Sequence, residues 1–342
     1  MRVAFVDLAR ENSALRVPLE AAARRVIESG HLLYGPELEA FEHEIAEWHG
    51  VKYAVGVASG TDALEIALRA TGRSGSTVAT TAMTAPATAN AIEAAGCTIA
   101  LLDPSATTRN ATVRADVAVH LYGLATECPF DAVEDCAHSM GATVDGKLAG
   151  TMGAVGAFSA YPTKIMGALG DGGWLVTNDA AIAERARAIR HYGFNEDRTD
   201  VATRGQNSRL CEMQAAFLRV KLSHVSGWNK RRQEIAARYT HELSGLVLTP
   251  YIPVGCSHVF HCYVIESEHR DLLRAKLAAL GVGTLAHYPR ALHQYDRWKG
   301  LGEPGQFPVA ERLAATVLSL PCFPMMTDEE QDWVIRCIKE FT

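Results

Sequence analysis

FSAYPTKIMGALGDGG, residues 158–173, places one lysine, Lys164, between a short apolar run and a glycine-rich loop. Burial lowers the pKa of an amine, because water no longer stabilises the ammonium ion. A neutral amine can attack a carbonyl carbon and form a Schiff base. The alternative is an ordinary loop lysine in water, the commonest fate of lysine. The neighbouring Ser159 and the glycines, which permit close approach of a bulky ligand, favour the buried position.

Two upstream motifs supply what such an amine needs. Asp135 follows Glu134 at the end of a short apolar segment, and a carboxylate at the end of a strand in an α/β sheet points into the ligand crevice. Ser59-Gly60-Thr61 follows a predicted strand and opens a helix, so free N–H groups, hydroxyls and the helix dipole all face an anion. An amine, a carboxylate and a phosphate-sized turn together predict a site for pyridoxal phosphate (PLP).

Each motif also has a simpler interpretation. Ser59 can be an ordinary helix N-cap. Asp135 can be an N-cap or a loop acid, and Glu134 is the rival carboxylate. Alternation along a strand favours Asp135, since Glu134 would then point the other way. Ser159 can be a hydroxyl at a strand edge rather than a donor to the cofactor phosphate.

The composition bounds the class of protein. The chain has 342 residues, of which 48% are hydrophobic and 21% charged, which is typical of a globular protein with one large core and a smaller domain. A net charge of −6 and the lack of a basic run predict no nucleic-acid binding. The apolar stretches are too short to span a bilayer, which predicts no membrane association.

The cysteines and the N-terminus predict a cytoplasmic protein. The eight cysteines are scattered and form no C-x-x-C pair, which is typical of reduced, buried thiols. Cys256 and Cys262 are close enough in sequence to form a disulfide, but we expect them to be free. The first ten residues, MRVAFVDLAR, meet an acid and a base before any signal-type apolar segment forms.

The hydrophobic pattern predicts an α/β protein. Helices over residues 18–29, 37–49, 62–70, 86–95 and 180–191 alternate with strands over 51–57, 77–80, 98–102, 117–121, 132–133, 155–160 and 174–177. This alternation predicts a mostly parallel sheet covered by helices. Further helices over 209–226, 228–243, 270–280, 309–314 and 328–341 surround strands over 259–265 and 283–287. We therefore predict a large PLP-binding domain over residues 1–226 and a small α+β domain over 227–342.

Several short blocks run in order along nearly the whole chain. They are IESG (27–30) with GPE (35–37), SGTDAL (59–64), HLYG (120–123), EDCAH (134–138), the lysine loop, RGQNSRL (204–210) with QAA (214–216), and HCY (261–263) with HYP (287–289) and LSLP (318–321). In this order the blocks resemble the PLP-dependent nucleotide-sugar aminotransferases of the DegT/DnrJ/EryC1/StrS family. The resemblance implies the aspartate-aminotransferase fold, fold type I.

The resemblance also implies a role for each matching residue. Lys164 would form the Schiff base with PLP, Asp135 would bind the ring nitrogen, and His138 would lie near the ring hydroxyl. Asn207 would reach the cofactor phosphate of the neighbouring subunit in a homodimer, although on its own it would equally be a helix N-cap. The phosphate would be held within one subunit by a set of small polar residues: Ser59, Gly60, Thr61 and Ser159.

Three features depart from the usual pattern of the family. His138 stands where the family usually has glutamine, and the charge of a histidine can vary near neutral pH. Ala85 follows Thr84 where an aromatic residue usually stacks on the cofactor ring, so cofactor binding would weaken or a different substrate would fit. Residues 104–115 and 124–131 are shorter than usual, in two regions where family members carry a helix.

The resemblance implies a two-step amino transfer from glutamate to a nucleotide-linked keto-sugar. Lys164 would move the proton and Asp135 would keep the ring nitrogen protonated. One alternative acceptor is a ketocyclitol of an aminoglycoside pathway, and one alternative function is a PLP-binding regulator without turnover, which Ala85 and the short stretches motivate. A sugar dehydratase of the same family would carry histidine in place of Lys164.

The histidines do not predict a metal site. His258 and His261 lie three apart near a predicted strand, a spacing that points them to opposite faces, and no acid or cysteine set accompanies them. The resemblance instead places His261 and His287 near the crevice between the domains, where either would touch substrate.

Overall fold

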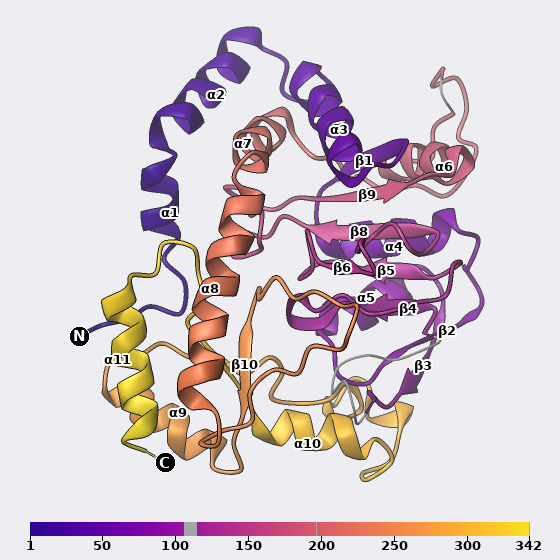
Figure 1. Ribbon diagram of the computed structural model, residues 1–342. Coiled ribbons are helices and arrows are strands. Elements are labelled where there is room, and N and C mark those ends of the chain that lie inside the picture. The colour runs from indigo at the N-terminus through magenta and orange to yellow at the C-terminus, as the bar shows by residue number, and fades with distance from the viewer. Residues whose placement is uncertain (106–114, 196, 342) are drawn as a thin grey trace.

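A seven-stranded sheet organises the first half of the chain in the computed structural model, which describes residues 1–105, 115–195 and 197–341. The strand order is β1-β9-β8-β5-β4-β2-β3 (Figure 1). The strands of this sheet are β1 (Tyr53–Val57), β2 (Thr77–Thr81), β3 (Thr98–Leu102), β4 (Val117–Val119), β5 (Val133–Asp135), β8 (Val155–Ser159) and β9 (Gly173–Thr177). A separate short hairpin joins β6 (Thr143–Val144) to β7 (Lys147–Leu148).

The sheet is mostly parallel, as the sequence predicts. Strands β3, β2, β4, β5 and β8 run parallel to one another, and β9 is antiparallel to both β8 and β1. The parallel strands are short and apolar because both faces of the sheet are covered. Their carboxyl ends therefore meet along one edge, where Asp135 ends β5 and Ser159 ends β8.

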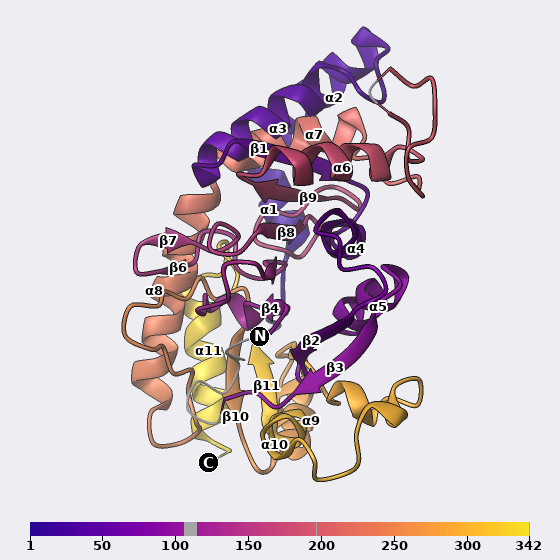
Figure 2. The same cartoon turned by 90° about the vertical axis from the view of Figure 1, so that its right-hand side faces the viewer.

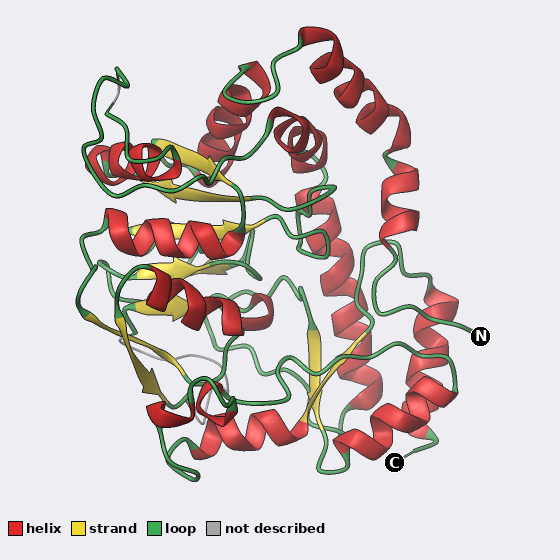
Figure 3. Ribbon diagram, turned by 180° about the vertical axis from the view of Figure 1, so that it is seen from behind, coloured by secondary structure: helices red, strands yellow, loops and turns green. Residues whose placement is uncertain are grey.

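Helices cover both faces of the sheet. Apolar residues of α4, α5 and α6 pack on one face, and those of α3 and α7 pack on the other together with the loops around β6 and β7. Figure 2 shows α4 and α5 on the same side of the strands, and in Figure 3, seen from behind, they cross in front of the sheet. These helices are α3 (Pro36–His49), α4 (Gly60–Ala70), α5 (Pro86–Ala94), α6 (Ala180–Arg190) and α7 (Glu212–Leu222).

The C-terminal part is a small α+β layer. The antiparallel pair β10 (Tyr263–Glu266) and β11 (Val317–Leu320) shares a buried cluster with α8 (Val225–Leu243), α9 (Arg270–Ala279) and α11 (Asp328–Lys339). Val3 belongs to the same cluster, where it pairs with Val282, so the start of the chain packs with its end. The division at residue 226 stays a prediction, and it falls in the first turn of α8, the long helix between the sheet and α11 in Figure 1.

Most predicted elements form within a few residues of their expected ends, but some expectations were wrong. Residues 283–287 are not a strand, since only Leu285 makes an isolated bridge, to Ser319. Helix α1 (Leu8–Ala14) and strand β11 were not predicted, and α2 (Arg16–Ser29) and α10 (Pro308–Thr316) are longer than expected. Strand β5 includes Glu134 and Asp135 rather than ending before them. Most of the short stretch 104–115 lies outside the described residues.

Two further properties of the described chain bear on the early expectations. All eight cysteines are free, including Cys256 and Cys262. Among the residues that the structure describes, no helix is long and apolar enough to cross a membrane.

Candidate active site

A cavity of about 270 Å³ lies at the carboxyl ends of the parallel strands. Its walls come from the turn before α4, the start of α5, the ends of β4, β5 and β8, the lysine loop, and Tyr288 from the C-terminal part. The cavity brings together seven of the eight residues expected to bind cofactor: Ser59, Gly60, Thr61, Asp135, His138, Ser159 and Lys164. Segments more than a hundred residues apart in sequence thus meet at one sheet edge.

The turn before α4 is built to hold an anion. Ser59 is the N-cap of α4, and its Oγ accepts a hydrogen bond from the backbone N–H of Asp62 at 3.1 Å. The simple N-cap interpretation is therefore correct for the oxygen of Ser59, while its hydroxyl proton stays free to donate. A Cβ on Gly60 would lie 2.4 Å from the Cβ of Ser159, so only glycine lets these two segments approach. The positive end of the α4 dipole faces this side of the cavity.

Asp135 projects into the cavity and Glu134 points the other way, as alternation along the strand requires. The Asp135 carboxylate accepts hydrogen bonds from Thr88 Oγ1 at 2.9 Å and from the backbone N–H of Ala137 at 3.2 Å. Burial raises the pKa of Asp135, and these two bonds and the nearby Lys164 charge oppose that rise. Two donors leave further lone pairs on this carboxylate, which can accept from a protonated ring nitrogen.

Lys164 lies opposite Asp135 in the same cavity. Burial lowers the pKa of its amine from 10.5 to about 8, although Cys262 and Asp135 act in the other direction. The side chain is partly exposed, because it opens into the cavity. This amine is still mostly protonated at pH 7, but it loses its proton far more readily than an exposed lysine does, and the neutral form is the one that attacks a carbonyl.

His138 lines the cavity as a neutral imidazole. Burial lowers its pKa well below 6.5, and the charge of Lys164 and the neighbouring His261 and His287 lower it further. The expectation that its charge would vary near neutral pH was therefore wrong. The backbone N–H of Tyr122 donates to Nδ1 of His138 at 3.3 Å, so Nε2 carries the proton and is the free donor.

His261 and His287 lie close to His138. The rings of His138 and His261 lie 4.4 Å apart, and burial lowers the pKa of His287 to about 4. Nδ1 of His287 lies 2.8 Å from Ser319 Oγ. His258 instead stacks on Phe260 at 4.0 Å. His258 and His261 thus have different ring neighbours, but both lie before β10 (Tyr263–Glu266), so the predicted alternation along a strand does not apply to them.

Ala85 lines the cavity, at the position where the resemblance implies an aromatic residue in other family members, and Tyr288 is the aromatic ring that the cavity gains from the C-terminal part. Sequence reasoning missed Thr88 and Tyr288. Thr88 is one helical turn beyond Thr84, to which it also bonds at 3.0 Å, and that i, i+4 spacing is a signal that could have found it. The position of Tyr288 depends on the packing of the C-terminal part, for which the local sequence gives no signal.

Asn207 does not line this cavity. It is exposed, pairs with His191 in an isolated bridge, and accepts a hydrogen bond from Arg209 at 2.9 Å. A larger hollow of about 1110 Å³ borders α6 and the segment that follows it, with several arginines in its wall. None of the described residues that line this hollow is a lysine, whereas the smaller cavity combines Lys164 with Asp135 and the turn before α4.

The fold and the cavity define a protein of fold type I that can hold PLP, since amine, carboxylate and anion turn all face one space. The comparisons narrow this class. The model of the DegT/DnrJ/EryC1/StrS aminotransferase family matches residues 15–339. The dTDP-3-amino-3,4,6-trideoxy-alpha-D-glucose transaminase of Streptomyces venezuelae is 40% identical and aligns over 99% of this chain and 96% of its own.

A solved structure and a second relative in sequence are also similar to this chain. The crystal structure of S. venezuelae DesV in complex with a ketimine intermediate superposes with a TM-score of 0.93 at 37% identity, covering 99% of this chain and 98% of that one. The pleiotropic regulatory protein of Geobacillus stearothermophilus is 36% identical over 100% of this chain and 99% of its own. The chain belongs to the DegT/DnrJ/EryC1/StrS aminotransferase family and is an aminotransferase of the α/β, fold type I class.

Proposed function

We propose that the protein uses PLP to move an amino group from glutamate to a nucleotide-linked keto-sugar. The observation that carries this proposal is the Lys164 amine, whose pKa burial lowers to about 8, in one cavity with Asp135 and the N-terminus of α4. When bound, PLP would supply an aldehyde for amines and a ring that draws electrons from a substrate carbon. The metabolic role is amino-sugar biosynthesis for an antibiotic or a polysaccharide.

Lys164 acts twice in this proposal. Its neutral Nζ would hold PLP covalently through the cofactor aldehyde until an amino donor takes its place. Once released, the amine would be the residue that moves a proton at the α-carbon of the donor. A pKa of about 8 suits both roles, because the amine gives and takes a proton near neutral pH.

Asp135 holds the ring nitrogen of the cofactor in the protonated state. Thr88 and the N–H of Ala137 fix the direction of its carboxylate. A buried, negatively charged acceptor next to that nitrogen favours the positive ring, which is the form that withdraws electrons. His138 Nε2–H donates to the ring hydroxyl, the role that glutamine has elsewhere in the family.

The phosphate would bind at the N-terminus of α4. The residues that would hold it are Ser59, Gly60, Thr61 and Ser159, through hydroxyl and backbone groups. Asn207 completes the phosphate site of the partner subunit in a homodimer, which agrees with its exposed position outside its own cavity. The eight free cysteines support a location in the cytoplasm.

The acceptor carbonyl is proposed at C3 of the sugar. The S. venezuelae relative is named for a dTDP-linked sugar that carries its amino group at C3. A panel of dTDP- and UDP-linked 3-keto and 4-keto sugars, with a ketocyclitol as the alternative acceptor, therefore decides the substrate. The expected result is amino-sugar formation from a nucleotide-linked 3-keto sugar with loss of glutamate.

The experiment has two parts. PLP is added to purified protein, and the visible absorbance of the bound cofactor is recorded before and after glutamate. We expect a visible band that glutamate bleaches, and we expect Lys164→Ala protein to lack the band. A band that persists in Lys164→Ala would contradict the assignment of the amine.

A regulator without turnover is the second candidate, because the Geobacillus relative is named as a pleiotropic regulatory protein and Ala85 removes the usual stacking aromatic. This candidate would bind PLP at the same cavity. A stable visible band that glutamate does not bleach would favour it over the aminotransferase.

A further inference from the structure

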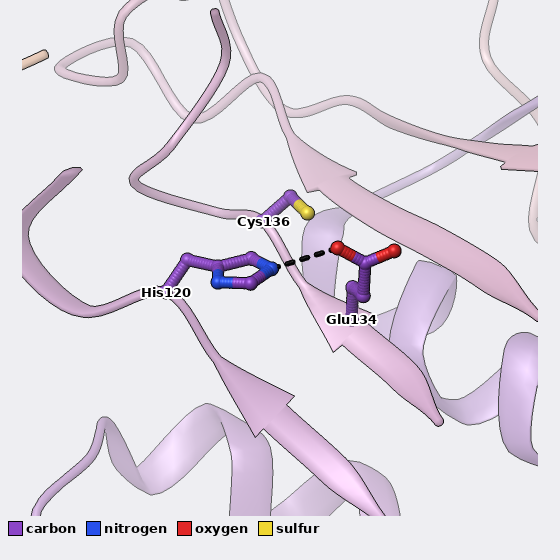
Figure 4. A group of neighbouring side chains, drawn as sticks. All are labelled: His120, Glu134 and Cys136. Atoms are coloured by element: carbon purple, nitrogen blue, oxygen red, sulfur yellow. Dashed lines mark hydrogen bonds and ion pairs between the residues drawn. The ribbon is translucent and has the colours of Figure 1, made fainter. Parts of the chain in front are cut away.

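A buried group of three side chains lies at the wall of the cavity, which His120 lines. His120, Glu134 and Cys136 have ligand-type atoms within 4.8 Å of one another, which superficially resembles a metal site (Figure 4). The hydrogen bonds show a different use. Oε2 of Glu134 accepts from His120 Nε2 at 2.8 Å and from the N–H of Gly150 at 2.7 Å, while Oε1 accepts from the N–H groups of Met152 and Gly153 at 2.8 and 2.6 Å. Four donors occupy the carboxylate, which leaves no free lone pair for a cation.

The protonation of His120 follows from its own partners. The backbone N–H of Thr126 donates to Nδ1 at 3.2 Å, so Nδ1 carries no proton and Nε2–H is the donor to Glu134. Glu134 accepts all four bonds. Burial alone would raise the pKa of Glu134, but the hydrogen bond from His120, its electrostatic attraction and the hydrogen bonds from Gly153 and Gly150 outweigh burial and lower that pKa. The side chain of this glutamate is fully buried.

Three segments of the cavity wall meet at this carboxylate. Glu134 precedes Asp135 on β5 and points to the opposite face of the strand. His120 lines the cavity, and its backbone N–H donates to the carbonyl of Asp135 at 3.1 Å. The Gly150–Gly153 loop leads into β8, which ends at Ser159 beside the anion turn. One side chain thus joins the segments that carry the ring-nitrogen partner and part of the phosphate site.

We propose that Glu134 is a positioning residue, whose four hydrogen bonds set the orientation of Asp135 and of the β8 end for cofactor binding. This proposal rests on the proposed function, since it concerns how the same cavity holds PLP. The Glu134 side chain does not line the cavity. It acts by fixing the backbone on either side of Asp135, where a displacement of about 1 Å can cost about 100-fold in activity.

Substitution by glutamine tests this geometry sharply. An amide has one oxygen and one NH₂ group, so either orientation directs NH₂ at two N–H donors. In one orientation the NH₂ group faces the N–H groups of Met152 and Gly153. In the other it faces the N–H of Gly150 and His120 Nε2–H, and His120 cannot move its proton to Nδ1 without losing the Thr126 bond. The nearly isosteric Glu134→Gln change therefore disrupts the network whichever way the amide turns.

Glu212 supplies a matched control. It is also a buried carboxylate that accepts three backbone N–H bonds, from Gly35, Glu37 and Leu38 at 2.8–3.1 Å, but it does not line the cavity. Glu212→Gln should lower the thermal unfolding midpoint and leave PLP affinity within about twofold of wild type. Glu134→Gln should lower the midpoint and also weaken PLP binding by about 10- to 100-fold, the size of the loss when a hydrogen-bond partner that orients a metal ligand is removed.

The readouts are PLP titration by absorbance, the pH at which the visible band changes, and circular dichroism for folding. The proposal is overturned if Glu134→Gln protein folds and keeps wild-type PLP affinity and an unshifted band. It is also overturned if Glu134→Gln loses no more PLP affinity than Glu212→Gln does. If Glu134→Gln does not fold, Glu134→Asp decides. It keeps the charge but is one methylene too short to reach all four donors, so we expect severalfold weaker PLP binding, and wild-type affinity overturns the proposal.

The proposed function and this inference fail in distinguishable ways. Wild-type protein that does not bind PLP refutes the function itself. Wild-type protein that binds PLP normally, together with an unaffected Glu134→Gln variant, refutes only the positioning role.

Discussion

Replacement of Lys164 by methionine should stabilise the cofactor-free protein, although it abolishes the proposed activity. Methionine keeps nearly the same length and apolar stem but carries no charge. The cofactor-free protein must hold a mostly buried ammonium ion at low pH, and burial is the largest influence on its pKa. Removal of that charge relieves the desolvation cost, so this substitution separates stability from function.

The magnitude follows from the pKa. A fall from 10.5 to about 8 corresponds to about 3 kcal/mol at 1.36 kcal/mol per pKa unit. This value already includes the attraction of Asp135, which would lose its cation in the variant. The amine opens partly into the cavity, where water screens it, so we expect the variant to gain about 1–3 kcal/mol in free energy of unfolding.

The gain should depend on pH in a definite direction. Below pH 8 the amine is charged in both folded and unfolded chains, so the wild-type protein carries the full penalty. Between pH 8 and 10.5 the unfolded chain binds more protons at this lysine than the folded protein does, so wild-type stability rises with pH. The advantage of Lys164→Met should therefore be full at pH 7 and should shrink as the pH rises toward 10.5.

The assay is urea unfolding of cofactor-free wild-type and Lys164→Met protein at several pH values from 7 upward, followed by circular dichroism. Lys52, which is exposed, provides the control substitution Lys52→Met, for which no such pH-dependent gain is expected. The claim that the Lys164 amine is desolvated would be refuted if Lys164→Met were no more stable than wild type at pH 7 and the difference in free energy of unfolding did not change with pH.

Three other outcomes are expected. Wild type and His138→Gln should bind PLP with the same pH dependence between about pH 6 and 8, because the pKa of His138 lies well below 6.5. A PLP affinity that changes with pH in wild type but not in His138→Gln would contradict this. Gly60→Ala should lower the free energy of unfolding by about 1–3 kcal/mol and weaken PLP binding, because its Cβ would lie 2.4 Å from the Cβ of Ser159. The control, Gly227→Ala, lies in open space on α8 and should raise the free energy of unfolding by about 0.5–1 kcal/mol. Thermal unfolding measures both. Ala85→Phe should tighten PLP binding by about 0.5–1.5 kcal/mol through restored stacking, and unchanged or weaker binding by titration would show that no ring face is open at this position.

Local sequence signals were sufficient for the fold and for most of the cavity wall. The parallel sheet was predictable because short apolar runs alternate with amphipathic helices, and the choice of Asp135 over Glu134 followed from strand alternation alone. The anion turn was predictable because Ser59-Gly60-Thr61 directly precedes α4. In each case the signal lies within a few residues of the feature.

Features that depend on contacts between distant segments were not predictable. Tyr288 reaches the cavity only because the C-terminal part packs against the sheet edge, and Val3 pairs with Val282 across almost the whole chain. The neutral state of His138 depends on burial beside Lys164 and His261, which its local sequence does not encode. The four donors to Glu134 likewise come from two other segments, His120 and the loop of residues 150–153.

The most direct test of the central claim is to identify which residue PLP modifies. PLP-loaded protein is reduced with borohydride, which makes the linkage between lysine and cofactor permanent, and its peptides are mapped by mass spectrometry. We expect a pyridoxyl mark on the peptide that contains Lys164 and on no other. A mark on a different lysine, or no mark after reduction, would contradict the assignment of Lys164 as the cofactor-binding amine.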